Sequence, residues 1–267
     1  MINLTLNSIV SDKRKIRLEK ILETPDSFLK EFLLDFLECD YMISYRLYLD
    51  DSGTHDGAVL QFLAGTMMSI DEWAKLDPLW CKKLNDYGLK TFHAKDVWGK
   101  HPQSAEIFRE LGELIFERNS ALWWGAVDKE DFQKIKKELP LIKESEFEFL
   151  VFGHIGGCPR AMDALGGKGR IGIIIEKGHP PIRPETRKRM EKLEREIGLF
   201  EHPWQTSPKG PVPLQVADYM AWNFNRYANT QDDNLPFLKF VNPDTKYRFW
   251  GRLFNEEYLR KMFKEYF

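Results

Sequence analysis

The fold of this chain is decided by residues 46–54, Arg-Leu-Tyr-Leu-Asp-Asp-Ser-Gly-Thr, where an apolar run ends in two adjacent carboxylates and turns through a glycine. Such a run favours a β-strand, which holds its side chains in place while the loop at its end reaches solvent. The first carboxylate, Asp50, can therefore be both rigidly placed and accessible. Aspartates also end strands because they favour turns, so the stretch indicates chemistry only if other segments supply partners.

The rest of the chain alternates between helical and strand-like patterns, starting with apolar residues at helical spacing over 12–38. In chain order, the predicted elements are strands over 45–50 and 59–67, helices over 70–87 and 103–118, a strand over 122–127, a helix over 144–165, a strand over 170–176, a helix over 183–197, a strand over 199–205 and a helix that starts at 213. Because Gly156-Gly157 and Pro159 interrupt the helix over 144–165, we expect a kink or break there.

This order resembles the ribonuclease H-like fold, an α/β fold in which a three-stranded antiparallel meander is followed by alternating helices and two further strands. The expected core is a mixed five-stranded sheet flanked by helices. We expect a helical N-terminal extension over 1–40, a ribonuclease H-like domain over 41–230 with a helical insertion at about 70–118 after the second strand, and a C-terminal extension over 231–267 that packs on the domain. The aromatic stretch over 247–267 either covers the core or forms a dimer contact, so a homodimer is one expectation.

Three carboxylates are expected to converge in this arrangement. Asp50 ends the first strand, and Glu176 ends the fourth, its parallel neighbour in the fold; Asp218 lies in the apolar stripe of the last helix and faces inward. Since three inward carboxylates repel one another, a divalent ion with a preference for oxygen ligands, Mg²⁺ or Mn²⁺, is the expected cofactor. Each residue has a structural alternative: Glu176 pairs with Lys177 or Arg170, Asp218 with a backbone amide or an arginine, and Asp50 caps the turn.

Four segments of the chain resemble a family of bacterial and phage proteins, the domain of unknown function 3800. They are Tyr-Leu-Asp-Asp-Ser-Gly at 48–53, Phe-His-Ala-Lys-Asp at 92–96, Ile-Ile-Glu at 174–176 and Leu-Gln-Val-Ala-Asp-Tyr at 214–219. The resemblance implies a ribonuclease H-like fold and metal-dependent nuclease activity. It also implies that Asp50, Glu176 and Asp218 are catalytic metal ligands, with His93 and Gln215 nearby. Where this chain has Asp51, the family commonly has glutamate, which leaves the role of Asp51 open.

Further residues are expected around these carboxylates, as supports or as substrate contacts. They are Asp51, Ser52, Asp96, Lys209 and Gln215. His93 is either a catalytic acid or base, or a phosphate contact, or a loop histidine packed against the backbone. Nucleic acid, DNA or RNA, is the expected partner. The basic excess of the helix over 183–197 and Lys209 are candidate phosphate contacts, although mixed-charge helices are often only solvated. Some of Trp123, Trp124, Trp204 and Trp222 stack on bases or pack in the core.

Composition narrows the class of protein. The 267 residues, 43% of them hydrophobic, suffice for one large domain, and the formal charge of −2 means that any nucleic-acid surface is a local basic patch. The three cysteines form no Cys-x-x-Cys pair, which argues against a zinc or redox site of that type. No signal peptide and no membrane-length apolar run is recognised, so we expect a cytoplasmic protein with no membrane partner.

The sequence therefore predicts a metal-dependent phosphodiester hydrolase, and three other classes were compared with it. Haloacid-dehalogenase phosphatases place a second aspartate two residues after the first, where this chain has Ser52. Sugar kinases and actin-like ATPases need a second, similar domain with its own glycine-rich hairpin, for which the chain is too short. A catalytically inactive nucleic-acid or protein-binding module of the same fold stays open.

Overall fold

The computed structural model of the chain describes residues 43–53, 57–167, 169–177, 182–200, 205–207, 210–231, 234–240 and 249–266. The predicted extension over 1–40 lies outside these ranges, as do Lys209 and Trp204.

One mixed sheet forms the centre of the molecule, with strand order β5-β4-β1-β2-β3-β6. Its strands are β1 (Ile43–Ser52), β2 (Leu60–Ser69), β3 (Ser120–Asp128), β4 (Arg170–Glu176), β5 (Gln205–Ser207) and β6 (Phe249–Phe254). The first three strands form an antiparallel meander, β4 runs parallel to β1, and β5 runs parallel to β4. These five strands confirm the predicted ribonuclease H-like arrangement.

A sixth strand, β6, was not predicted. It pairs parallel with β3 at the far end of the sheet, so part of the segment 231–267 belongs to the sheet itself. Gly251 in its middle makes this possible, because the Trp124 ring occupies the place where a Cβ would stand. A short aromatic run broken by glycine gives no clear strand alternation, which is why the pattern was not recognised.

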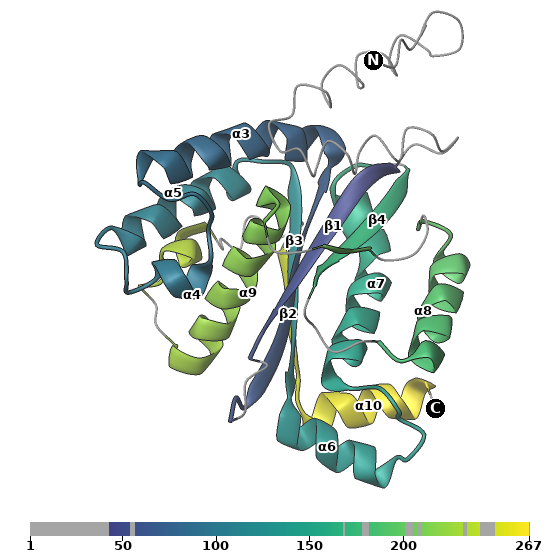
Figure 1. Cartoon of the computed structure of the whole chain (residues 1–267). Coiled ribbons are helices and arrows are strands. Elements are labelled where there is room, and N and C mark those ends of the chain that lie inside the picture. The colour runs from purple at the N-terminus through teal and green to yellow at the C-terminus, as the bar shows by residue number, and fades with distance from the viewer. Residues whose placement is uncertain are drawn as a thin grey trace, which may run out of the picture.

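The helices form two layers, one on each face of the sheet (Figure 1). One layer holds α3 (Ile70–Asp86), α4 (Ala94–Val97), α5 (Ser104–Phe116) and α9 (Val212–Thr230), with the 3₁₀ helix η1 (Pro236–Phe240) against α5. The other holds α6 (Lys129–Glu138), α7 (Glu146–Ala164), α8 (Pro184–Ile197) and α10 (Glu256–Tyr266). Each layer encloses its own hydrophobic core, and we call the two faces the α9 face and the α7 face.

Helix α7 forms without the predicted break. It is continuous from Glu146 to Ala164 with Pro159 inside it, and a capping box between Ser145 and Glu148 starts it. Ten of its residues are buried, so packing against the sheet outweighs the local cost of Gly156-Gly157 and Pro159.

The strand predicted over 199–205 differs from the structure: the described part contains only a bridge at Phe200 and the short β5.

The turn after β1 depends on glycine. Gly53 has φ of 82°, and a Cβ there would stand 2.2 Å from the carbonyl oxygen of Leu60. Only glycine tolerates both the left-handed backbone and this close approach.

No helix among the described residues is long and apolar enough to cross a membrane.

Candidate active site

The end of β1 and the end of β4 bring two of the predicted carboxylates together. The parallel register pairs Tyr48 with Ile174 and Leu49 with Ile175, so Asp50 and Glu176 come next, side by side. Tyr48 and Ile174 belong to the core of the α9 face. Since strand side chains alternate between faces, Asp50 and Glu176 also point to the α9 face. Asp50 is only 3% exposed and Glu176 is half-buried.

The third predicted carboxylate, Asp218, lies on α9 and is 7% exposed. Its Oδ2 accepts hydrogen bonds from Nδ1 of His93 at 3.0 Å and from the backbone amide of Ala94 at 2.7 Å. His93 is the N-cap residue of α4 but makes no cap hydrogen bond of its own, so Asp218 caps α4 from another helix. A backbone amide is one of the structural alternatives open to Asp218 in the sequence, and the structure shows that contact together with one to His93.

The tautomer of the neutral His93 ring follows from this contact. An ionised carboxylate only accepts, so Nδ1 carries a proton toward Asp218, and in the neutral ring Nε2 then holds the lone pair. Nε2 lies 3.9 Å from Asp96, which is exposed on α4 and pairs with Lys100 at 2.8 Å. The hydrogen bond from Lys100, with a smaller contribution from His93, lowers the pKa of Asp96. Asp96 therefore lies at the rim of the site.

Gln215 fixes the segment that carries His93. Its side chain is buried, and its Oε1 accepts from the Trp80 indole at 3.0 Å and from the Phe92 amide at 2.9 Å. Its Nε2 donates to the carbonyl of Gly210 at 2.6 Å. Gln215 thus ties α9 to α3 and to the residue before His93, which makes it a positioning residue in this structure.

The side chains of Asp51 and Ser52, at the end of β1, point to opposite faces of the sheet. Ser52 stands opposite Phe62 in the α9-face core, and its Oγ accepts a hydrogen bond from Asn225 of α9 at 2.7 Å. Asp51 stands opposite Leu63 in the α7-face core, so its side chain points away from Asp50. The structure therefore does not bring Asp51 to the other carboxylates.

Asn225 is a residue that the sequence analysis missed. It lies seven residues, two helical turns, after Asp218, so both are on the same side of α9. Because Asn225 reaches Ser52 on β1, this side of α9 faces the strand that carries Asp50. The seven-residue spacing in the sequence could have predicted that Asn225 lies on the same side of the helix as Asp218. The Trp80 contact to Gln215 joins residues 135 positions apart, so no local sequence pattern predicts it.

The donor set of this site fits a hard divalent cation. Carboxylates from two strands and one helix supply oxygen ligands, the type that Mg²⁺ and Mn²⁺ prefer. Among the residues that the structure describes, no three Asp, Glu, His or Cys side chains lie close enough to hold one ion as they stand. Binding an ion would thus require the side chains to converge.

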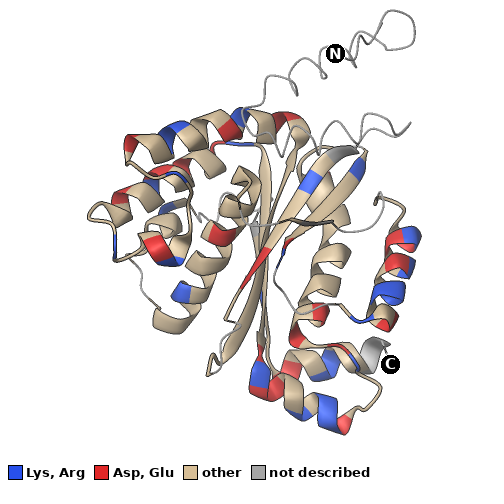
Figure 2. Cartoon of the chain, in the orientation of Figure 1, with Lys and Arg blue, Asp and Glu red and all other residues tan. Residues whose placement is uncertain are grey.

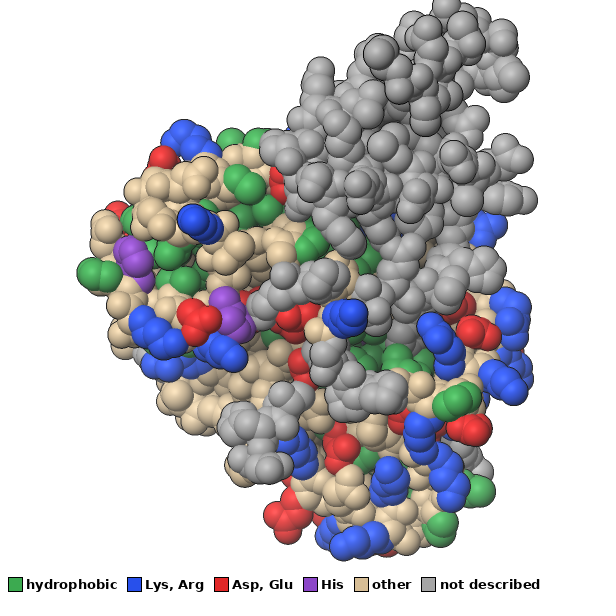
Figure 3. Space-filling view, viewed as in Figure 1, with side chains coloured by type: hydrophobic (Ala, Val, Ile, Leu, Met, Phe, Trp, Pro, Cys, Tyr) green, Lys and Arg blue, Asp and Glu red, His purple; other side chains and the backbone are tan. Residues whose placement is uncertain are grey.

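The basic residues of α8, predicted as phosphate contacts, are largely neutralised by glutamates. Arg183 binds Glu148 of α7 at 2.7 Å, and Arg189 pairs with Glu144. Burial alone would raise the pKa of Glu148, but hydrogen bonds from Arg183 and from the Ser145 amide lower it to about 2. Figure 2 shows acidic and basic residues alternating along α8, and Figure 3 shows both kinds intermixed over α6, α8 and α10.

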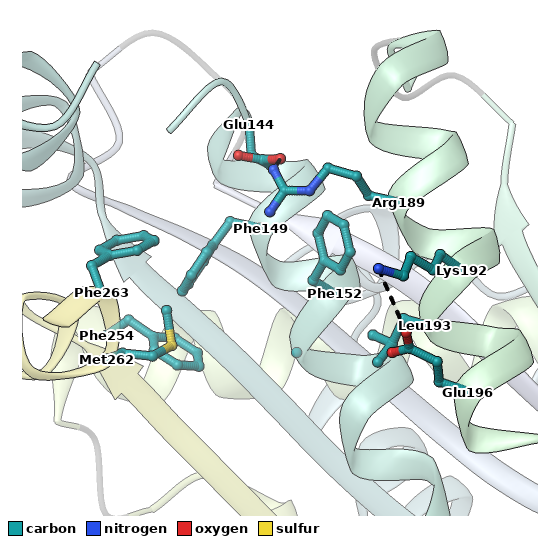
Figure 4. Close-up of a pocket in the computed structure, with 11 residues that line it drawn as sticks. Glu144, Phe149, Phe152, Arg189, Lys192, Leu193, Glu196, Phe254, Met262 and Phe263 are labelled. Atoms are coloured by element: carbon teal, nitrogen blue, oxygen red, sulfur yellow. Dashed lines mark hydrogen bonds and ion pairs between the residues drawn. The ribbon is translucent and has the colours of Figure 1, made fainter. Parts of the chain in front are cut away.

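A pocket of about 540 Å³ lies on the α7 face (Figure 4). Phenylalanines from α7, β6 and α10 line it, and Arg189 and Glu144 stand at its rim (Figure 4). None of the three carboxylates predicted as metal ligands, nor His93 or Gln215, lines this pocket, whereas Arg189 and Lys192 of the basic helix α8 do. The candidate site and the pocket thus belong to different faces of the sheet.

Comparisons with known proteins give distant structural likenesses. No family model and no curated protein matches the chain. Bst-RNase HIII in complex with Mn²⁺ is similar at 14% identity and a TM-score of 0.42, over 72% of this chain and 54% of that one, so this chain spans about half its length. RNase HII from Archaeoglobus fulgidus, in a complex with PCNA, is similar at 16% identity and a TM-score of 0.43, over 71% of this chain and 76% of that one. Aquifex aeolicus RNase H3 is similar at 14% identity and a TM-score of 0.38, over 85% and 68%. At these scores, none of the likenesses assigns a site or an activity to this chain.

Proposed function

We propose that the chain is a metal-dependent phosphodiester hydrolase that cleaves DNA or RNA. Asp50, Glu176 and Asp218 would hold one or two Mg²⁺ or Mn²⁺ ions. One observation carries the proposal: Asp50 and Glu176 stand side by side on the face covered by α9, where Asp218 is hydrogen-bonded to His93. Membership of the domain of unknown function 3800 and the nucleic-acid partner rest on the sequence resemblance. A homodimer stays a prediction.

The chain's own groups have distinct tasks in this proposal. A bound divalent ion would activate a water molecule and stabilise the leaving oxygen. Asp218 holds His93 with Nδ1 protonated, so that Nε2 can accept a proton at the rim of the site. Gln215 keeps the segment before His93 on α9, and Ser52 and Asn225 hold the end of β1 against the same helix. These contacts preorganise the groups around the substrate.

A second candidate is an inactive binding module of the same fold. The observation that favours it is that no three acidic, histidine or cysteine side chains in the described ranges approach closely enough to hold one ion. Such a protein would bind nucleic acid or protein without cleaving it.

Calorimetry with Mn²⁺ and a cleavage assay on labelled DNA and RNA separate these candidates. We expect the wild type to bind Mn²⁺ and cleave at least one substrate, and Asp50→Asn to lose both. Asp51→Asn is the matched control, because it removes the neighbouring carboxylate, which points to the opposite face. If the wild type neither binds Mn²⁺ nor cleaves, the hydrolase proposal fails; if both variants behave alike, the site is misplaced.

A further inference from the structure

A cation on α9, Arg226, differs from the paired arginines near the start of α8. In α9, Val212–Thr230, Arg226 is the only basic residue and Asp218 the only acidic one, and the helix is almost free of charge in Figure 2. Among the described residues Arg226 forms no ion pair, whereas Arg183, the N-cap residue of α8, and Arg189 of α8 both pair with glutamates. Arg226 thus keeps its positive charge available to a ligand.

Two tryptophans fix the guanidinium of Arg226. Its central carbon lies 5.1 Å from the ring centre of Trp98 and 5.4 Å from that of Trp222. These rings pack on Phe108 at 5.0 and 4.9 Å, so they form a firm aromatic wall. The Nε of Arg226 is buried and has no hydrogen-bond partner, and the residue as a whole is half-buried. A planar guanidinium held in this way presents its outer N–H groups with little loss of side-chain freedom.

The position of Arg226 connects it to the candidate site. Asp218, Trp222 and Arg226 follow one another at four-residue steps, so they form one stripe along α9. The segment 93–98 lies along this stripe: His93 contacts Asp218, and Trp98 contacts both Trp222 and Arg226. At 1.5 Å per residue, Arg226 lies about 12 Å along the helix from Asp218. A nucleic-acid strand covers this distance in a few nucleotides.

We propose that Arg226 binds a backbone phosphate of a nucleic-acid strand that extends from the carboxylates along α9. The ligand is a phosphodiester chain, DNA or RNA. In this proposal it binds along α9 and not along α8. The inference rests on the proposed function. The alternative role for Arg226 is only to pack over the two aromatic rings. In that case its loss would lower stability and leave nucleic-acid affinity unchanged.

The test measures binding of labelled single-stranded DNA and RNA by fluorescence anisotropy in the Asp50→Asn background, which should not cleave the probe. We expect Arg226→Gln, which keeps much of the stem, to raise the Kd about tenfold and to lower the slope of log K against log salt by about one. Arg226→Lys keeps the charge and should recover part of the affinity. Arg187→Ala removes a cation of α8 that pairs with Glu191 at 4.0 Å and should change the Kd less than twofold.

Three results would overturn the inference, and they differ in whether they also overturn the proposed function. If the parent binds an oligonucleotide and Arg226→Gln binds it equally well, the phosphate contact is wrong while the proposed function stands. The same holds if Arg187→Ala weakens binding and Arg226→Gln does not, since the strand then follows α8. If the parent binds neither oligonucleotide and the wild type binds no Mn²⁺, both proposals fail. Thermal denaturation of each variant identifies any loss that comes from unfolding.

Discussion

Buried carboxylates lie on both faces of the sheet, but different groups hold them. On the α7 face, Glu148 is 2% exposed and receives the guanidinium of Arg183 together with two backbone amides. On the α9 face, Asp218 is 7% exposed and accepts from an imidazole and one amide. A guanidinium that is hydrogen-bonded to a carboxylate neutralises its charge and stays protonated. An imidazole in the same place can also accept or donate a proton. Burial alone therefore does not identify a site; the kind of partner does.

The two faces should accordingly respond to mutation in different ways. The α7 face ties α7 to α8, so its carboxylates should matter for stability. The α9 face gathers Asp50, Glu176 and Asp218, so its carboxylates should matter for activity. Asp218→Asn and Glu148→Gln test this division.

The largest effect is expected from Asp218→Asn. Asparagine still offers an oxygen to the Ala94 amide, so the fold should persist with a Tm close to that of the wild type. Cleavage should fall on the order of a thousandfold, the scale seen when one preorganised electrostatic group is lost. Steady-state cleavage rates and thermal denaturation together give the answer. Cleavage near the wild-type rate would remove Asp218 from the proposed ligand set.

Gly53→Ala should disturb both faces, because Gly53 ends the strand that carries Asp50. A methyl group at φ of 82° would meet the Leu60 carbonyl at 2.2 Å, so we expect a loss of about 3 kcal/mol in the free energy of unfolding. Gly57→Ala is the control: its φ is 89°, but nothing lies within 4 Å of the added Cβ. It should cost only about 1 kcal/mol. Equal losses in urea denaturation would show that the close approach to Leu60 is not important.

Glu148→Gln should weaken the α7 face and leave activity per folded molecule unchanged. We expect a loss of about 2 kcal/mol at neutral pH, because Arg183 loses a charged partner while remaining partly exposed to solvent. The pKa of Glu148 is lowered to about 2 in the folded chain, below its usual 4.5, so its contribution is present above pH 4.5 and disappears as the pH falls toward 2.

Denaturation of the wild type and of Glu148→Gln at neutral and at acid pH measures this contribution. The difference between the two proteins should shrink at acid pH, where the glutamate becomes protonated. A difference that stays constant with pH would mean that packing, and not charge, accounts for the loss.

Much of the sheet could be predicted from local pattern. The strand β4 was predicted with its observed bounds, because a run such as Ile171–Ile175 is apolar on both faces and ends in a carboxylate. The order of the first five strands followed from the alternation of patterns. The resemblance of that order to the ribonuclease H-like fold then placed Asp50 next to Glu176, since parallel neighbours end at the same edge.

The contacts of the candidate site were harder to predict, because they join distant segments. Asp218 meets His93 across 125 positions and Ala94 across 124, and no local pattern encodes such pairs. Asp51 was expected near Asp50, but adjacent residues of a strand point to opposite faces, and only the register shows which face is which.

The smallest expected effect concerns the hydrogen bond between Ser52 and Asn225, which joins β1 to α9. Asn225→Ala should lower the free energy of unfolding by about 1 kcal/mol, the usual contribution of one partly buried hydrogen bond. A double-mutant cycle with Ser52→Ala isolates the pair, because the double variant should lose less than the sum of the two single variants. If the bond also holds Asp218 toward Asp50, Asn225→Ala should reduce cleavage severalfold at full folding, whereas additive losses and unchanged cleavage would make it only a surface contact.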